Sequence, residues 1–399
     1  MSTGTPGLAP DAPVARAAAG RDRYPLALAP LQVRGVTFAN RLFFAAMGVD
    51  LADHAGGMSE ALDGFLDGLL GSGCGALVLS NASVSRDSIL QPKGLRMVTA
   101  AHADAMRPFL QRAERAGVVA GVQLQHYGGQ GTTTFTRGQP LWTPSGIGSK
   151  AVAKLDPRYR TKAMSVDEIH AVQQQFAAAA ALCRGAGARM VQLQASNGYL
   201  LGSFMSRHTN RRTDGYGGSQ PARNRMLVET VAAVRRALGD EIVLGVRIGI
   251  DDGLGPEGLV PDDLNEALPA LEQAGADLFE ASFYIADTFG QLAARTPEAI
   301  ARLHGQVAAV RRRCRVPLGF AGYVDGLPHA ESVLAAGVAD MAGMARALFA
   351  DNDLILKTVE GREHEIHRCL WDGKCFKDKY NPRFDRVYCC VNPKYLRPA

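Results

Sequence analysis

The chain has 399 residues, of which 47% are apolar and 21% are charged, so it is long enough to bury a large core. Its formal net charge is only +5, and the lysines and arginines are scattered among acids, which gives no indication of a nucleic-acid-binding or membrane-binding surface. No apolar run reaches the length of about 18 residues that a membrane span requires.

The first 24 residues are rich in Ala, Pro and Gly, and they lack a basic start followed by an apolar stretch. Residues 1–24 are therefore predicted to form a flexible leader and not a signal peptide. The chain has seven cysteines, and Cys74, Cys183 and Cys314 lie in apolar or helical surroundings. An odd number of cysteines in such places favours a reducing, cytoplasmic location over a disulfide framework.

Eight short apolar runs follow along the chain, and the segments between them carry apolar residues at helical spacing. The runs are 42–47, 75–83, 119–126, 190–196, 243–249, 278–283, 317–322 and 340–345. Apolar strands that alternate with helices predict an α/β fold with a parallel sheet, and eight such units match a (β/α)8 TIM barrel over 25–360. A doubly wound sheet is the alternative, but no glycine-rich fingerprint follows the first run.

Two segments fall outside this repeat. Residues 127–165 form an insertion after the third strand that is too long for an ordinary βα loop, so it is a candidate lid or substrate wall. Residues 361–399 form a C-terminal tail that contains four cysteines.

Polar residues occur where the predicted strands end. They are Asn81, Gln123, Gln194, Arg247 and Ser282. Any one of them can be explained as a residue that fills the barrel and is satisfied by a neighbour. Five strands that end in this way favour an aromatic ligand with many acceptors at the C-terminal mouth of the barrel, where ligands of this fold bind.

The last two units indicate what else this ligand carries. The stretches "GFAGY" (319–323) and "GMARAL" (343–348) each place a small residue at a strand end just before a helix, and the second adds Arg346. Loops after the seventh and eighth strands form the usual phosphate site of this architecture, and an arginine can clamp a phosphate with two hydrogen bonds.

The stretches "PLQVRGVTFANRLFFAAM", "VQLQHYGGQ", "NGYLLGSFMSRHTNRRTDGYGGS" and "MARALFADND" resemble the signatures of the Old Yellow Enzyme family, the NAD(P)H:flavin oxidoreductases. The resemblance runs from about Leu31 to the C-terminus and implies one FMN in the barrel. It implies that Gln123 binds the pyrimidine ring and that Arg247 faces its N1/O2 side. The cofactor-binding positions that it implies are Ala46, Met47, Asn81, Gln123, Arg247, Gly322, Gly343 and Arg346, of which the last three would hold the phosphate.

The same resemblance implies the catalytic residues. In the family, a His and a second His or Asn three positions later hold the oxygen of an activated alkene. The flavin gives hydride to one alkene carbon, and a Tyr two positions further on protonates the other carbon. Here these positions are Gln194, Asn197 and Tyr199. Gln194 departs from the pattern, because a glutamine can donate an N–H but cannot become cationic as histidine can.

The tail "RCLWDGKCFKDKYNPRFDRVYCCVNP" resembles the iron–sulfur segment of the amine dehydrogenases and dienoyl-CoA reductases. The implied metal ligands are Cys369, Asp372, Cys375 and Cys389, with Asp372 at a position that normally holds a cysteine. Three thiolates and a carboxylate can hold an iron–sulfur cluster with one weak corner, and they can also bind zinc. A third interpretation is that the site has decayed and binds no metal.

The resemblance implies an FMN-dependent oxidoreductase that transfers hydride from NAD(P)H through flavin to an activated, carbonyl-conjugated alkene. The alternative is an FMN and iron–sulfur dehydrogenase that oxidises an amine or a cyclic substrate and passes electrons to a partner. A flavin-binding scaffold is the non-enzymatic alternative, and Tyr199 argues against it because a scaffold needs no proton donor. We further expect a small-molecule substrate and a homo-oligomer, with no nucleic acid and no membrane among the partners.

Overall fold

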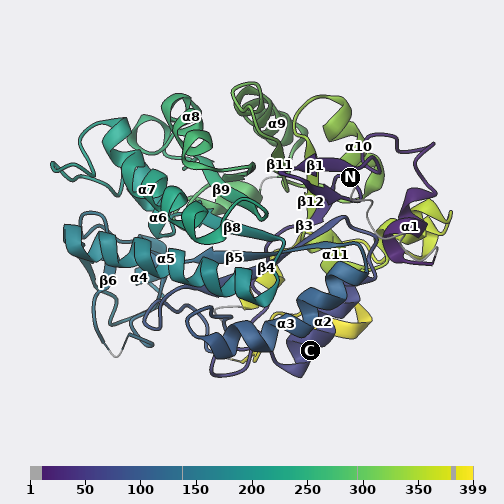
Figure 1. The fold of residues 1–399 in the computed structure, drawn as a ribbon, viewed down its shortest axis with the longest axis horizontal. Coiled ribbons are helices and arrows are strands. Elements are labelled where there is room, and N and C mark those ends of the chain that lie inside the picture. Colours follow the sequence, from purple (N-terminus) through teal and green to yellow (C-terminus); the bar gives the residue numbers. More distant parts are fainter. Residues whose placement is uncertain (1–10, 137, 294, 379–382, 399) are drawn as a thin grey trace.

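The computed structural model describes residues 11–136, 138–293, 295–378 and 383–398. Its centre is a closed barrel of eight parallel strands, and helices surround it (Figure 1). Each strand pairs with the next along the chain, and the last closes onto the first, which confirms the predicted TIM barrel. The strands are β3 (Leu42–Phe44), β4 (Ala76–Ser83), β5 (Val119–Gln125), β8 (Met190–Ala195), β9 (Val243–Asp251), β10 (Leu278–Phe283), β11 (Leu318–Phe320) and β12 (Met341–Met344).

Several of the helices between these strands begin at a serine or threonine whose side chain caps the helix. Helix α5 (Val166–Ala186) shows this best: Ser165 and Glu168 form a capping box at its start, and Gly187 ends it with φ of 94°, a conformation that glycine adopts easily. The main helices are α2 (Glu60–Leu70), α3 (Ala100–Arg115), α5 (Val166–Ala186), α7 (Gln220–Leu238), α8 (Leu264–Ala274), α9 (Pro297–Arg311), α10 (Leu327–Ala335) and α12 (Leu354–Val359). Shorter ones are α4 (Lys150–Ala153), α6 (Leu200–Met205), α11 (Arg346–Ala350), α13 (Lys374–Lys377) and the 3₁₀ turns η1 (Gly128–Gln130), η2 (Gly255–Glu257), η3 (Pro261–Asp263), η4 (Phe289–Ala293), η5 (Glu363–Glu365) and η7 (Pro393–Tyr395).

A hairpin closes the N-terminal end of the barrel. Strands β1 (Leu31–Val33) and β2 (Val36–Phe38) pair antiparallel, and Phe38 is fully buried. The apolar side chains of the hairpin form one cluster with the inward-facing residues at the beginning of the barrel strands. Because this end is filled by side chains, a ligand of the barrel has to enter at the opposite, C-terminal end.

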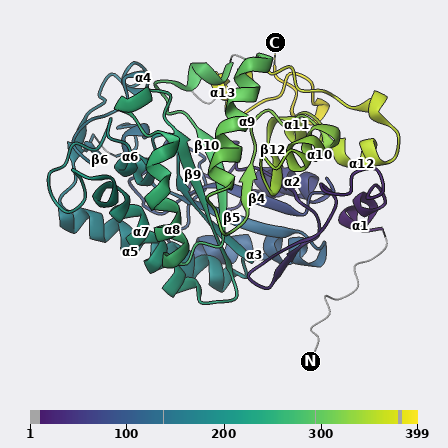
Figure 2. The same ribbon diagram turned by 90° about the horizontal axis from the view of Figure 1, so that it is seen from above.

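The insertion of residues 127–165 contributes no strand to the barrel, as expected. It contains η1, α4 and a separate two-stranded parallel sheet made of β6 (Leu141–Thr143) and β7 (Thr161–Ala163). Asp156 holds the loop together, because its carboxylate accepts hydrogen bonds from the hydroxyls of Thr132 and Thr133 at 3.0 and 2.7 Å. Figure 2 shows β6 beside α6, at the edge of the barrel.

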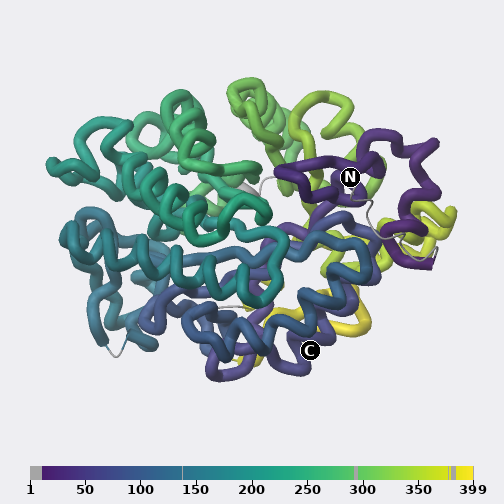
Figure 3. Tube along the Cα trace, in the orientation of Figure 1, coloured from purple at the N-terminus to yellow at the C-terminus, as the bar shows by residue number. Residues whose placement is uncertain are grey.

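The described part of the leader differs from the flexible segment that was expected. Helix α1 (Pro13–Ala18) packs against α12, and Val14 and Ala17 are buried. Arg16 forms an ion pair with Glu360. The beginning of the described chain therefore lies beside its C-terminal helices, as the purple and yellow-green segments of Figure 3 show. No helix among the described residues is long and apolar enough to span a membrane.

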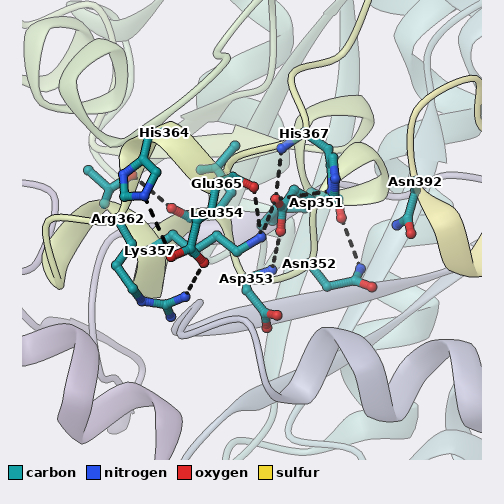
Figure 4. A network of polar contacts seen from close by, with 12 residues as sticks. Asp351, Asn352, Asp353, Leu354, Lys357, Arg362, His364, Glu365, His367 and Asn392 are labelled. Atoms are coloured by element: carbon teal, nitrogen blue, oxygen red, sulfur yellow. Dashed lines mark hydrogen bonds and ion pairs between the residues drawn. The ribbon is translucent and has the colours of Figure 1, made fainter.

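The tail is attached to the segment that follows β12. The buried carboxylate of Asp351 accepts a hydrogen bond from Lys357 Nζ at 2.7 Å and another from the backbone N–H of His367 at 2.9 Å (Figure 4). Near the end of the chain, the side-chain amide of Asn392 donates to the carbonyl of Phe349 at 2.7 Å. Both ends of the tail are thus fixed to the end of α11 and its following turn.

Candidate active site

The five polar residues that end the predicted strands meet at the C-terminal mouth of the barrel. Side chains of a strand alternate between its two faces, so residues two positions apart share the barrel interior. A chain of side-chain hydrogen bonds crosses this interior. Asn81 donates to Gln123 Oε1 at 3.2 Å, and Gln123 donates to Gln192 Oε1 at 2.6 Å. Gln192 in turn donates to Glu280 Oε2 at 2.9 Å, which links β4, β5, β8 and β10.

Arg247 connects this chain to the first strand. Its Nη1 lies 3.5 Å from Glu280 Oε1, and it also donates to the backbone carbonyl of Ala46 at 3.3 Å. Nη2 donates to the hydroxyl of Ser282 at 3.4 Å. The neighbouring Met47 is partly buried against the core. The guanidinium therefore stands between β3 and β10 at the mouth, and a buried carboxylate offsets its charge.

Gln194 and Asn197, the pair expected to hold a substrate oxygen, differ in the hydrogen bonds that their side-chain amides make. Both N–H groups of the Asn197 amide are engaged, because they donate to the backbone carbonyls of Phe283 and Tyr284 at 2.9 and 3.1 Å. The amide oxygen of Gln194 accepts from the Ser196 hydroxyl at 2.6 Å. Asn197 thus ties the end of β8 to the end of β10, and the amide N–H₂ of Gln194 makes no hydrogen bond to the described residues.

Tyr199 lies at the N-terminal end of α6, directly after this turn. Its ring packs edge-on against Tyr127, with the centroids 5.6 Å apart. Burial raises the pKa of the Tyr199 hydroxyl, and the nearby Gln125 amide and the Arg247 charge lower it by smaller amounts. The phenol is therefore protonated at neutral pH, which is the state that a proton donor needs.

Several buried polar atoms at this mouth have no hydrogen-bond partner among the described residues. They are Ser80 Oγ, Gln125 Nε2, Arg247 Nε and Glu280 Oε1. Buried polar atoms are normally satisfied, so a set of unsatisfied donors and acceptors around one opening indicates a polar ligand. Donors and acceptors on four different strands suit the pyrimidine ring of a flavin, which presents both kinds of group around its edge. The residues present therefore fit FMN.

The two glycines that were expected at the phosphate have a packing reason of their own. A Cβ on Gly343 would lie 2.4 Å from the ring of Phe43, and a Cβ on Gly322 would lie 2.1 Å from the ring of Phe320. Any larger residue would push these rings out of place. Close aromatic packing alone thus requires glycine at both positions, and Arg346 is the residue of this group that points to an anion.

The insertion forms one wall of a cavity at the mouth, beside the turn that carries Asn197. The cavity is lined from the insertion, from the loop after β8, from the end of α6 and from the loop after β9, by residues that include Gln130, Thr143, Gly198, Ser206 and Asp252. Asp252 is almost fully buried, and this burial raises the pKa of its carboxyl although the Ser206 hydroxyl donates to it. The cavity is small, and it adjoins the turn of Asn197 that is expected to bind a substrate.

The tail brings its cysteines together beside Arg346. Cys369, Asp372, Cys375, Cys389 and Cys390 line one cavity with Arg346. Asp372 is hydrogen-bonded to Cys390, and burial together with this carboxylate raises the pKa of the Cys390 thiol to about 11. Among the residues that the structure describes, no three histidine, cysteine or acidic side chains converge as metal ligands do. The cluster therefore stays a prediction, and no step of the chemistry below depends on it.

Sequence reasoning missed four residues of the site. Gln125, Gln192 and Glu280 face the barrel interior because each lies two positions from a polar residue that was predicted, and strand alternation alone could have found them. Trp371 contacts Arg346, and no local pattern in the sequence indicates that contact.

Comparisons with known proteins match the chain over most of its length. The model of the NADH:flavin oxidoreductase / NADH oxidase family matches residues 27–365. The "Multifunctional alkene reductase/demethylase OYE" of Caballeronia cordobensis is 28% identical over 328 residues, which cover 79% of this chain and 45% of that protein. The "N,N-dimethylglycine/sarcosine dehydrogenase" of Chromohalobacter salexigens is 28% identical over 365 residues, which cover 88% of this chain and 51% of that protein.

Among solved structures, the complex of 2-naphthoyl-CoA reductase with 2-naphthoyl-CoA superimposes with a TM-score of 0.85 at 24% identity, over 93% of this chain and 57% of that chain. This likeness shows that the fold is shared. The chain spans about half the length of the first curated relatives that it matches.

Proposed function

The chain belongs to the NADH:flavin oxidoreductase / NADH oxidase family, and on this premise we propose that it is an FMN-dependent oxidoreductase that reduces an activated, carbonyl-conjugated alkene with NAD(P)H. The resemblance to the Old Yellow Enzyme family is thereby confirmed. The observation that carries the proposal is the meeting of unsatisfied polar atoms, the Arg247 cation and the Tyr199 phenol at one barrel mouth.

The residues of this chain divide the work as follows. Asn81, Gln123 and Arg247 would hold the ring system of the flavin, and Arg346 would hold its phosphate. When bound, FMN supplies the hydride chemistry, and the protein supplies position and charge. A guanidinium at the N1/O2 side favours an anionic reduced ring, and Glu280 limits this effect because its carboxylate lies 3.5 Å from Arg247.

Gln194 and Tyr199 would act on the substrate. The Gln194 amide has an N–H₂ group that no described residue accepts, and it would donate to the carbonyl oxygen of the alkene. Asn197 would position this turn, since both of its N–H groups hold the end of β10. Tyr199 would give its hydroxyl proton to the carbon that becomes a carbanion after hydride transfer.

The substitution Tyr199→Phe tests this assignment, because reduction of the flavin by a nicotinamide needs no proton donor. We expect the reductive half-reaction to be almost unchanged and the reaction with a simple enone to slow by about 10²–10⁴-fold, which is the usual contribution of a positioned acid. Stopped-flow absorbance separates the two half-reactions. Tyr388→Phe is the matched control, because the Tyr388 hydroxyl is bonded at 2.7 Å to the exposed Asp385. Equal slowing of both half-reactions, or of neither, refutes the role of Tyr199.

A second candidate function is the oxidation of an amine or a cyclic substrate, with electrons passed singly through the tail to a partner protein. It is supported by the five thiol and carboxylate side chains that line one cavity, and by the similarity to a dehydrogenase. Iron and sulfide analysis of protein purified without oxygen distinguishes the two candidates. Stoichiometric iron and sulfide favour the dehydrogenase, whereas FMN without iron favours the reductase.

A further inference from the structure

One aromatic residue of the tail lies against the arginine expected at the phosphate. The guanidinium carbon of Arg346 is 4.2 Å from the centroid of the Trp371 ring, and that of Arg295 is also 4.2 Å from it. Trp371 follows Cys369 in the tail, whereas Arg346 is the first residue of α11, directly after β12. Segments 25 residues apart thus meet at the end of the barrel where a phosphate is expected.

The Arg346 guanidinium has no carboxylate partner. It forms neither an ion pair nor a hydrogen bond with any residue in the described part of the chain, whereas Arg295 pairs with Asp325 at 2.6 Å. Arg346 is partly buried, and burial lowers its pKa because the charged form loses solvation, while the nearby thiols of Cys369 and Cys375 raise it by smaller amounts. A partly buried guanidinium whose N–H groups bond no described residue has room for an acceptor, so this position is suited to an anion.

We propose that Trp371 positions Arg346 for the phosphate of FMN, so that docking of the tail and binding of the cofactor strengthen each other. This inference rests on the proposed function. A guanidinium that stacks on an aromatic ring uses its face, and the N–H groups on its edge stay available for two hydrogen bonds to a phosphate. Stacking therefore orients the arginine without competing with the anion.

Contacts between the tail and α11 can couple the docking of the tail to the position of Arg346. Asn392 holds the carbonyl of Phe349, and the rings of Phe349 and Tyr395 stack with their centroids 5.3 Å apart. The backbone of His367 is held by Asp351 at the other end. The tail thus contacts Arg346, which starts α11, and also Phe349 and Asp351 at its end. Any ligand that orders Arg346 then favours the docked tail, and the docked tail favours the ligand by the same factor.

The experiment compares the binding of FMN and of riboflavin to the flavin-stripped full-length protein by flavin fluorescence. Riboflavin has the same ring system but lacks the phosphate. For Trp371→Ala we expect FMN affinity to fall between about 3-fold and about 30-fold, the range of a cation–π contact, while riboflavin affinity stays unchanged. Trp371→Phe keeps a ring and should lose less. Leu370→Ala is the matched control, because the neighbouring Leu370 side chain is 62% exposed.

A second measurement tests the reverse direction. FMN should slow proteolysis of the tail in the unsubstituted protein, and this protection should be lost in Trp371→Ala. If the unsubstituted protein does not bind FMN, the proposed function itself fails. If it binds FMN but Trp371→Ala binds FMN equally well, or loses FMN and riboflavin affinity in the same proportion, Trp371 is only a packing residue and this inference is overturned. Should Trp371→Ala not fold, Trp371→Phe and Trp371→Leu give the same comparison.

Discussion

Replacing Glu280 by glutamine removes one charge from the barrel interior and keeps an acceptor for the hydrogen bond from Gln192, which is 2.9 Å long. Glu280 is only 2% exposed, and its Oε1 lies 3.5 Å from Arg247 Nη1. With an effective dielectric constant of about 20, two unit charges at this distance attract by about 5 kcal/mol. The substitution Glu280→Gln therefore leaves the Arg247 cation without its counter-charge.

Removing one partner of a buried pair usually costs about 3–5 kcal/mol, because the remaining charge is uncompensated. We expect Glu280→Gln to lower the free energy of unfolding of the flavin-free protein by about 3 kcal/mol. This value is at the low end of that range because the Arg247 side chain is 19% exposed, so that solvent stabilises part of its charge. Urea unfolding followed by circular dichroism measures this change. The double variant with Arg247→Met should lose less than the sum of the two single variants, because the two residues interact.

Whereas Glu280→Gln should destabilise the folded protein, it should stabilise the reduced form of the bound flavin. With Glu280 neutral, the full charge of Arg247 stabilises the anionic reduced ring, so the midpoint potential should rise by about 30 mV, which equals about 1.4 kcal/mol for a two-electron couple. Spectroelectrochemical titration of the holoenzyme measures this potential. A variant that is as stable as the unsubstituted protein and has the same potential would refute the argument, because it would show that Glu280 does not act as a counter-charge to Arg247.

Three other predictions concern separate parts of the molecule. Arg346→Ala should weaken FMN binding more than Gln123→Ala, because it removes a charge-assisted contact; equilibrium binding of FMN to the stripped variants compares them. Burial lowers the pKa of the His126 imidazole to about 3, so below pH 6.5 the unfolded state binds a proton that the folded state does not. The free energy of unfolding should therefore fall as the pH decreases from about 6.5 towards 3. Urea unfolding at several pH values measures this dependence, and His126→Gln should flatten it. If the dehydrogenase candidate holds, protein purified without oxygen should contain iron and sulfide, and serine at Cys369, Cys375 and Cys389 should abolish both without removing FMN; the reductase candidate predicts FMN without iron.

The barrel could be predicted because its information is local. Each of the eight strands is an apolar run of the kind that a buried parallel strand requires, and the helices between them carry apolar residues at helical spacing, with caps at some of them, as α5 has in Ser165 and Gly187. The packed leader could not be predicted in this way. Helix α1 has only two buried side chains, Val14 and Ala17, and they are buried by α12, which lies at the other end of the sequence.

Site residues could be predicted where a polar residue interrupts an apolar strand. Contacts between residues that are distant in the sequence could not be predicted. Gln123 and Arg247 stand out inside apolar strands, and a strand-end position places them at the mouth. The engagement of both Asn197 N–H groups by β10 depends on how the ends of β8 and β10 meet across β9, which lies between them in the barrel, and no local feature of the sequence contains this. The contact of Trp371 with Arg346 likewise depends on where the tail docks.

The two arginines of the site differ in a way that matches the two ends of FMN. Arg247 is paired with the buried carboxylate of Glu280, so the region around it is close to neutral and suits the uncharged ring of an oxidised flavin. Arg346 has no acidic partner in the described part of the chain, and it stacks on Trp371, so it keeps its full charge for a phosphate. In a purely structural role, the N–H groups of both guanidiniums would normally have acceptors within the protein, since unsatisfied donors lower stability. The distribution of acids around the two arginines therefore supports a ligand with a neutral ring at one end and an anion at the other.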